Sequence, residues 1–463
     1  MSYKNITVIG GGSVNWMYGL MKDVFLIDEI EGGNIKLVDP DKEYTGVVCE
    51  LLKTFNKVST KDFRITIEEN RKKAFERADF VLLTFSPGSL DAFENDLEIP
   101  VKYGIVQPVS MTVGPSGISS ALRTIPVAYK IAEEMEEICP GAWILNETNP
   151  MSVVTKALTL PAKTVKVIGL CHGIHELRLI ANSVFGLKMP DGMPAYEYLY
   201  DWLEKQEFEY KVAGLNHFIF LTEARYKGRD IIPEIRKFCN EYKANFLTSS
   251  GQHSQATTAF SSSHGAAIQL CKIFGYIPIN YDRHTVEFMG NLCNVHNGFG
   301  MKYGVEKTTI DYRRIRKQKQ YEFIKKIVCG SEEIIWRMSG EELPPIMRAI
   351  ATNKKFKTVV NVPNTGQIPS LQKGAVVETL GYIDAEGITP IKSDLPKGID
   401  TLCRLHVDIQ ELTLQAALEG RRDLLEMALA IDPLCNQTDL RFIPEMANEL
   451  LESNKQWLPQ FFK

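Results

Sequence analysis

The first third of the chain alternates short apolar runs with amphipathic stretches. Apolar runs typical of buried strands cover residues 6–9, 35–38, 80–85, 142–145 and 165–169. Between them, apolar side chains recur every three or four positions, as over residues 118–129, where Pro126 should kink the helix. Strands separated by helices predict βαβ units, and therefore an α/β fold with a doubly wound parallel sheet of Rossmann type.

The regular alternation fades after about residue 190. The later sequence predicts a strand at 207–213, a loop over the polar, uncharged stretch 247–264, and long helices at about 307–337 and 401–430. This mixture is typical of an α+β unit. We therefore place a boundary near residue 195, between an N-terminal Rossmann-type domain, residues 1–195, and a C-terminal α+β domain, residues 196–463.

A glycine-rich turn follows the first predicted strand. Gly10 and Gly12 allow a tight bend and close backbone approach to a pyrophosphate, and Ser13 opens a helix whose N-terminus favours phosphate. Asn15 stands where a dinucleotide fingerprint has its third glycine. Asp39 ends the second strand at a distance suited to ribose hydroxyls, which favours NAD over NADP because an acid repels a 2′-phosphate. A tight strand-to-helix turn without a ligand is the alternative.

Three more polar side chains follow predicted strands. Asn149, before Pro150, suits the start of a helix, but it also lies where parallel sheets bind ligands. Cys171 and His217 each end a strand-like run, and a thiolate and an imidazole there could share a metal ion. Two protein ligands would leave coordination positions open for a substrate. A buried cysteine and a hydrogen-bonded histidine are the alternative.

Asp282, Arg283 and His284 form a polar triplet shortly after Tyr276 and Tyr281. In a pocket, Asp282 could act as a base and Arg283 could clamp a carboxylate. On the surface, the same two residues would only form an ion pair. The residues alone leave both possibilities open.

The composition excludes several classes of protein. Lys+Arg 53 against Asp+Glu 57 gives a formal net charge of −4, whereas a general nucleic-acid binder carries a basic excess. The chain has no run of about 18 apolar residues and no start typical of a signal peptide, so we expect neither a membrane span nor export. Its nine cysteines are expected to be reduced thiols in the cytoplasm.

Five motifs complete the pattern and carry a resemblance to a known family. They are Gly10–Ser13, Glu147–Met151, Gly169–Gly173, Gly214–Phe218 and Val360–Gly366. They occur in this order in glycoside hydrolase family 4, which the chain resembles over essentially its whole length. Three shorter stretches, residues 87–91, 112–115 and 282–284, look closest to the branch of the α-galacturonidases and α-glucuronidases.

The resemblance implies a route by oxidation and elimination, which is an exception to the usual two-carboxylate mechanism. NAD takes a hydride from C3 of the sugar, and the resulting ketone makes the C2 proton acidic. A base removes that proton while a divalent metal, usually manganese, holds the C2 and C3 oxygens, and the C1–O bond then breaks. Water adds and the hydride returns to C3, so NAD is regenerated in each turnover.

The resemblance also implies roles for single residues. Cys171 and His217 match the metal ligands, and Asn149 matches a residue at the sugar and metal. His172 occupies the position of a proton donor that is Asp in some members.

The base and the substrate arginine come from the polar triplet. Asp282 matches the acid proposed as base in members that lack the usual tyrosine there, and Tyr281 and Tyr276 are the other candidates for this role. Arg283 matches an arginine that contacts substrate.

Two departures from the family pattern bear on the substrate. Phosphosugar members carry an arginine shortly before a segment that begins here with Ile99 and Pro100. Residues 92–100 contain no arginine, which argues against a 6-phosphoglycoside. Gly173 stands where the galacturonidases have glutamate, and it matches glucosidases and glucuronidases instead. The expected activity is therefore cleavage of an α-linked hexuronide, either a galacturonide or a glucuronide.

Other functions remain open at this point. One is an α-glucosidase or α-galactosidase of the same family, and another is a plain NAD-dependent 2-hydroxy-acid dehydrogenase, which has no use for Cys171 facing His217. A non-enzymatic nucleotide sensor is a third. The expected partner is a small carbohydrate rather than nucleic acid or membrane, and the expected assembly is a homo-oligomer, a dimer or a tetramer.

Overall fold

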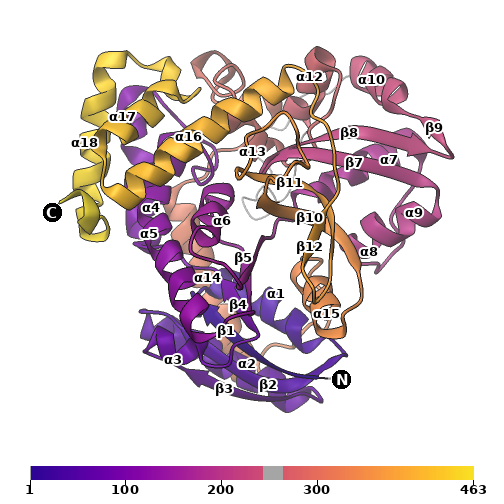
Figure 1. The fold of residues 1–463 in the computed structure, drawn as a ribbon, viewed down its shortest axis with the longest axis vertical. Helices are drawn as coiled ribbons and strands as arrows, with labels where there is room; N and C mark the ends of the chain where they lie inside the picture. The colour runs from indigo at the N-terminus through magenta and orange to yellow at the C-terminus, as the bar shows by residue number, and fades with distance from the viewer. Residues whose placement is uncertain (1, 243–263, 463) are drawn as a thin grey trace.

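A computed structural model describes residues 2–242 and 264–462 (Figure 1). The loop predicted over residues 247–264 lies, except for His264, outside the described residues. Within them, twelve strands form one sheet in the order β3-β2-β1-β4-β5-β6-β10-β11-β7-β8-β9, with β12 paired to β11. Helices cover both faces of this sheet, which confirms the predicted α/β class.

The first half of the sheet is parallel. Its strands are β1 (Ser2–Ile9), β2 (Ile30–Val38), β3 (Asp62–Ile67), β4 (Phe80–Leu83), β5 (Trp143–Asn146) and β6 (Lys166–Gly169). Val8 pairs with Leu37 on one side and Leu82 on the other, and all three are buried, as apolar runs in a doubly covered sheet require. The edge strand β3 was not among the predicted strands, because most of its side chains are partly or fully exposed.

The second half of the sheet continues it with antiparallel strands. These are β7 (Phe208–Leu215), β8 (Phe218–Tyr226), β9 (Arg229–Asp230), β10 (Phe356–Pro363), β11 (Val376–Ile383) and β12 (Ile388–Pro390). Asn361 of β10 pairs with Gly169 of β6, so the sheet runs unbroken from the predicted N-terminal domain into the C-terminal one. The boundary at residue 195 stays a prediction.

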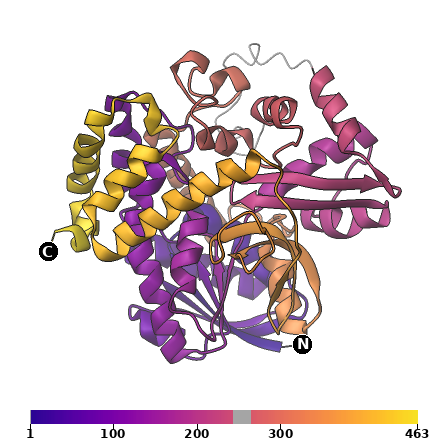
Figure 2. The ribbon, with the colours of Figure 1, turned by 45° about the horizontal axis from the view of Figure 1, so that its top comes forward.

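Two helical layers enclose the parallel strands. One layer packs on one face of the sheet and comprises α1 (Val14–Phe25), α2 (Lys42–Val58), α14 (Ile310–Val328) and α15 (Leu343–Thr352). The other comprises α4 (Ser89–Glu98), α5 (Gly114–Ile138), α6 (Met151–Thr159), α16 (Ile399–Glu419), α17 (Arg422–Ile431) and α18 (Ile443–Ser453). Figure 2 shows the last three lying along α4 and α5, so helices from the first third and from the last part of the chain share one layer.

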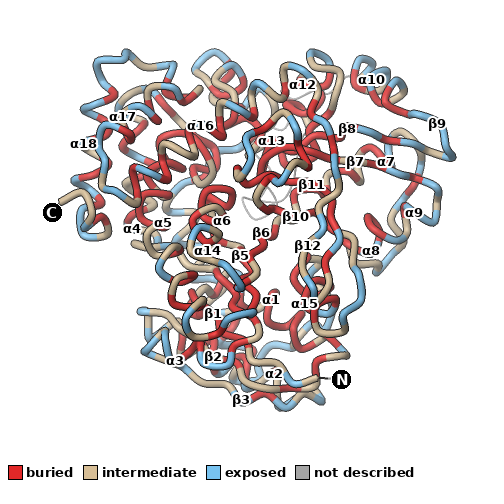
Figure 3. Tube along the Cα trace, viewed as in Figure 1, coloured by how far each residue is buried: buried red, intermediate tan, exposed pale blue. Residues whose placement is uncertain are grey.

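A third apolar cluster lies under the antiparallel strands. Its helices are α7 (Leu177–Phe185), α10 (Ile232–Glu241) and α12 (Gly265–Phe274). Four short α-helices lie elsewhere in the described chain: α3 (Arg71–Phe75), α8 (Ala195–Glu197), α9 (Leu203–Lys205) and α13 (Asp282–Thr285). Figure 3 shows buried positions concentrated along the strands and on the inner sides of the helices. No described helix combines the length and apolar character that crossing a bilayer requires.

Two predicted helices are shorter in the structure than the sequence indicated. The helix expected over residues 307–337 ends at Val328, and an irregular segment leads from there to α15. The helix expected over residues 401–430 is two helices, because Gly420 has φ +69° and ends α16. In contrast, Pro126 lies inside α5 without ending it.

Candidate active site

A cavity of about 1050 Å³ opens at the carboxyl ends of the parallel strands. Gly10, Gly12, Ser13 and Asp39 line one part of it. The other part is lined by the remaining predicted site residues except Asp282, namely Asn149, Cys171, His172, His217 and Arg283. The fold thus brings together residues up to 273 positions apart in the chain, from Gly10 to Arg283.

The glycine turn has the geometry of a dinucleotide site. Gly10 has φ +93°, and a Cβ there would lie 2.6 Å from the backbone carbonyl of Thr84, so only glycine fits. The backbone N–H of Gly12 donates to Asp39 Oδ2 at 3.0 Å, which places the carboxylate beside the turn. Asn15 Oδ1 is buried in the same cavity without a partner among the described residues. An adenosine ribose and a pyrophosphate fit this arrangement.

Cys171 and His217 present a sulfur and a nitrogen to the cavity. Burial raises the pKa of the Cys171 thiol well above its usual value, so the thiolate needs a cation to form at neutral pH. Burial lowers the pKa of His217 to about 3, which keeps this imidazole neutral. Its Nδ1 is hydrogen-bonded to Thr112 Oγ1 at 2.6 Å, and its ring stacks on His284 at a centroid distance of 3.8 Å.

Cys171 and His217 suit a metal ion that keeps coordination positions open for substrate. Because Thr112 engages Nδ1 of His217, Nε2 is the ring nitrogen left to bind a cation. Among residues 2–242 and 264–462, no group of three or more His, Cys, Asp or Glu side chains forms a complete metal site. Asn149 Oδ1, buried in the cavity and without a partner in the described chain, offers an additional oxygen. Substrate oxygens would complete the coordination.

His172 is paired with a carboxylate that the sequence did not reveal. Its Nδ1 lies 2.8 Å from Glu341 Oε2. Although burial opposes the charge, Glu341 raises the pKa of His172 above its usual value. The ring of His172 lies 6.0 Å from that of Tyr281. A protonated imidazole held in this way can act as an acid.

The structure turns Asp282 away from the cavity. Its carboxylate accepts hydrogen bonds from the backbone N–H groups of Ala266 at 2.9 Å and Ala267 at 3.0 Å, at the start of α12. Of the two adjacent side chains, Tyr281 lines the cavity and Asp282 does not. Tyr276 packs instead against Arg236, whose guanidinium lies 5.0 Å from the ring centroid. The geometry therefore supports Tyr281, not Asp282, as the group that can reach a substrate.

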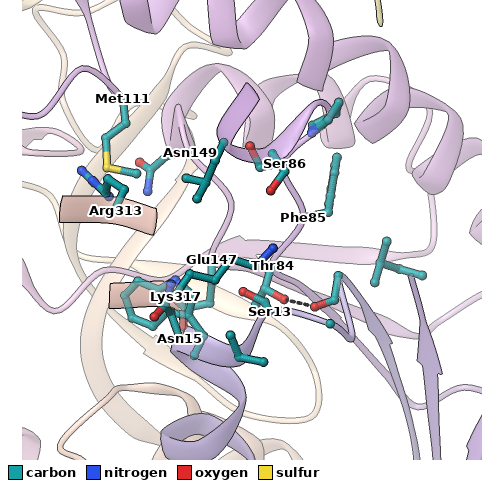
Figure 4. A pocket seen from close by; sticks show the side chains of 18 of the residues that line it. Ser13, Asn15, Thr84, Phe85, Ser86, Met111, Glu147, Asn149, Arg313 and Lys317 are labelled. Atoms are coloured by element: carbon teal, nitrogen blue, oxygen red, sulfur yellow. Dashed lines mark hydrogen bonds between the residues drawn. The ribbon is translucent and has the colours of Figure 1, made fainter. Parts of the chain in front are cut away.

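Arg283 has a second arginine beside it that the sequence did not reveal. Arg313 of α14 lines the same cavity, where its Nε donates to Thr308 Oγ1 at 2.9 Å. Figure 4 shows Arg313 beneath Met111 with Asn149 nearby, while Lys317 and Ser13 lie lower in the view. Arg313 lies in a strongly basic helix, and the sequence does not indicate which of its basic side chains faces the cavity and which face solvent.

Asn280 explains how the glycine at position 173 is accommodated. A Cβ on Gly173 would lie 2.2 Å from Asn280 Nδ2, so the amide occupies the space of a side chain there. Asn280 is 1% exposed and lines the cavity, and its Nδ2 has no partner among the described residues. This amide is therefore available to donate to a bound sugar.

Glu287 ties two loops of the site together. It is fully buried, and its carboxylate accepts from the backbone N–H groups of Val109 at 2.6 Å and Ser110 at 3.0 Å. Ser110 has φ +62°, a conformation that these hydrogen bonds help to hold. The contact fixes the segment that leads to Thr112, and hence to His217.

We expect the Glu287→Gln variant to gain melting temperature relative to wild type as the pH rises from about 5 to about 8. Burial raises the pKa of Glu287 to about 7, whereas an unfolded glutamate titrates near ~4.3. Between these values the folded state binds more protons, so the stability that wild type draws from this group falls with increasing pH. Glutamine does not titrate. A melting-temperature difference that stays constant across this range, measured by calorimetry without metal, would contradict the assignment.

The chain is similar to glycosyl hydrolases over most of its length. Residues 5–184 match the model described as family 4 glycosyl hydrolase, and residues 212–435 match the family 4 glycosyl hydrolase C-terminal domain. The chain is 31% identical over 461 residues to an α-galacturonidase of Thermoanaerobacterium saccharolyticum, with 98% of this chain and 96% of that protein covered. It is 32% identical to an α-galacturonidase of Bacillus subtilis, with 96% of both covered.

Solved structures agree on the fold. A putative glucosidase from Bacillus subtilis superposes with a TM-score of 0.85 at 30% identity, covering 97% of this chain and 100% of that one. A 6-phospho-α-glucosidase from gut microorganisms, solved in complex with NAD and Mn²⁺, gives a TM-score of 0.80 at 20% identity, covering 99% and 100%. At 20% identity the second likeness bears on the fold alone.

Proposed function

Because the chain belongs to family 4 of the glycosyl hydrolases, we propose that it cleaves an α-linked hexuronide, with an α-galacturonide as the first candidate. NAD and a divalent cation, manganese in our proposal, would be its cofactors. The hydride would leave and return at C3 of the sugar, so NAD would be regenerated in each turnover.

One observation carries the choice of an acidic sugar. Arg283 and Arg313 line the same cavity as the candidate metal ligands Cys171 and His217. A guanidinium can bind a carboxylate through two parallel hydrogen bonds. Four α-galacturonidases, each matching at least 96% of this chain, support the same substrate class. The glycine at position 173 supports an α-glucuronide as the second candidate.

The cofactor sites follow from the residues described above. Bound NAD supplies a hydride acceptor, and a bound divalent cation withdraws electrons from sugar oxygens. The turn Gly10–Ser13 would hold the pyrophosphate, and Asp39 would accept hydrogen bonds from the ribose. Cys171 and His217 would hold the cation, with the amide oxygen of Asn149 facing the same space.

We assign the two proton transfers to groups that line the cavity. Tyr281 would remove the proton from C2, because its ring faces the site while the carboxylate of Asp282 is bound to the backbone of α12. His172, paired with Glu341, would donate a proton to the leaving oxygen as the C1–O bond breaks. In this proposal Tyr281 is the base, a role that the sequence had assigned to Asp282.

A substrate panel tests the proposed specificity. We expect the nitrophenyl α-galacturonide to exceed the α-galactoside in kcat/KM by roughly 30- to 1000-fold, because a neutral sugar offers no carboxylate to the guanidinium groups that line the cavity. The Arg283→Lys variant should lose more activity on the galacturonide than on the galactoside, since lysine keeps the charge but loses the two-pronged donor. Preference for the galactoside or for a 6-phosphoglycoside would overturn the proposed substrate.

The contact between Thr112 and His217 gives a prediction for the metal site. We expect Thr112→Val to weaken Mn²⁺ binding about 10- to 100-fold, because the hydroxyl that orients the imidazole is lost while the shape is kept. Thr112→Ser retains the hydroxyl and serves as the matched control. Titration calorimetry with Mn²⁺ measures both variants, and equal affinities in the two would contradict this role of Thr112.

Assembly and location complete the proposal. We propose a homo-oligomer, because large apolar side chains stay exposed on the surface, including Ile335 at 66% and Trp336 at 38%. We also propose a cytoplasmic location, which suits the nine cysteines, all free in the structure. Light scattering on the purified protein tests the first statement, and cell fractionation tests the second.

A further inference from the structure

A second cavity, of about 480 Å³, adjoins the active-site cavity. His172 and Tyr281 line both, so these two side chains stand where the cavities meet. Two segments far apart in the sequence form most of the remaining wall, residues 189–195 and 337–341. The volume lies in the range of pockets that hold a small organic ligand.

The segment 337–341 is held in place at two points. The backbone N–H of Ser339 donates to both carboxylate oxygens of Asp23, at 3.0 and 3.1 Å, and the Ser339 hydroxyl also contacts Asp23. Glu341 is bound to His172 at 2.8 Å. The rim of the second cavity is therefore tied both to α1 and to the proposed proton donor, and it needs little ordering when a ligand enters.

The charges of the second cavity favour an anion. Arg178 and Arg337 line it, and among the described residues neither forms an ion pair with a carboxylate. Among the described residues, Arg178 donates through Nε to the carbonyl oxygen of His175 at 2.9 Å. The one carboxylate in the wall, Glu341, is engaged by His172. Methionines 189, 193 and 338 supply adaptable apolar surface between the charges.

We propose that this cavity is the subsite for the leaving group, and that Arg178 and Arg337 select a leaving group that carries a carboxylate, such as a second hexuronate. The inference rests on the proposed function, since it takes the sugar that is oxidised to lie in the first cavity. A proton donor at His172 must face the bond that breaks. The leaving group then extends past His172 and Tyr281, away from the NAD site and into the second cavity.

Two substrates that share the galacturonide but differ in the leaving group test this assignment. One is α-1,4-digalacturonate, whose leaving group is an anion, and the other is nitrophenyl α-galacturonide, whose leaving group lacks a carboxylate. For Arg337→Gln we expect the ratio of kcat/KM for the first substrate over the second to fall about tenfold, the effect of losing one charged contact. Arg178→Gln should lower the ratio similarly. Arg348→Gln, an exposed arginine of α15 outside both cavities, is the matched control.

The outcomes separate the subsite from the proposed function. A ratio that stays within about twofold of wild type in both Arg337→Gln and Arg178→Gln would overturn the subsite, even if both galacturonides are cleaved. A digalacturonate methyl-esterified on its leaving residue should respond to the variants as the nitrophenyl substrate does. If wild type cleaves neither galacturonide, the proposed substrate class fails, and this inference fails with it.

Discussion

A Cys171→Ser variant should lose about 10³-fold or more of its glycosidase activity in the presence of NAD and Mn²⁺. A catalytic cation contributes several kcal/mol of charge stabilisation, and each ~1.4 kcal/mol corresponds to about tenfold in rate. The Cys171 thiol binds a cation only as a thiolate, and a serine hydroxyl in the same place does not ionise near neutral pH. The measurement is kcat/KM on nitrophenyl α-galacturonide over a range of Mn²⁺ concentrations.

Two controls show that the loss arises at the metal site. NAD affinity of Cys171→Ser, measured by fluorescence titration, should change by less than about threefold, because the glycine turn and Asp39 lie in the other part of the cavity. Cys329→Ser, at an exposed cysteine, should keep wild-type activity. Full activity of Cys171→Ser in the presence of a chelator would contradict the metal assignment.

A Tyr281→Phe variant should stop the exchange of the C2 proton with solvent. The phenylalanine keeps the ring that lines the cavity but removes the phenol oxygen that would take the proton in our proposal. General base catalysis is worth about 10²- to 10⁴-fold, so kcat should fall by a similar factor. In deuterium oxide, NMR of the product measures deuterium at C2. Hydride transfer to NAD should remain visible at 340 nm in a single turnover.

Asp282→Asn is the matched comparison for the same experiment. Its carboxylate accepts two backbone hydrogen bonds at the start of α12, so its loss should lower the melting temperature. The folded fraction should still place deuterium at C2. Loss of exchange in Asp282→Asn together with retention in Tyr281→Phe would return the role of base to the aspartate.

The parallel half of the fold could be predicted from the sequence because its information is local. A buried strand is an apolar run, and the turn Gly10–Ser13 with Asp39 after the next strand keeps its meaning in any Rossmann-type unit. The antiparallel half could not be predicted in the same way. Its strand order joins β6 to β10, and nothing in the sequence around Gly169 and Asn361 specifies that pairing.

Site residues could be predicted where they belong to a sequence motif. Partners that reach the site only through the tertiary fold could not be predicted. Cys171, His217 and Asn149 follow strands, and the structure does gather them in one cavity. Glu341 meets His172 across 169 positions of sequence, from an irregular segment with no periodicity. The choice between Tyr281 and Asp282 was hidden for another reason. Adjacent side chains at the start of a short helix point in different directions, and the sequence does not say which one faces the cavity.

The central claim is that NAD shuttles a hydride within one site during glycoside cleavage, and a single measurement tests it directly. The protein, with Mn²⁺ and substoichiometric NAD, is mixed with excess nitrophenyl α-galacturonide, while nitrophenolate and the absorbance at 340 nm are recorded together. The account predicts many equivalents of nitrophenolate per NAD and no net NADH. One NADH formed for each sugar consumed would contradict it and would indicate a dehydrogenase.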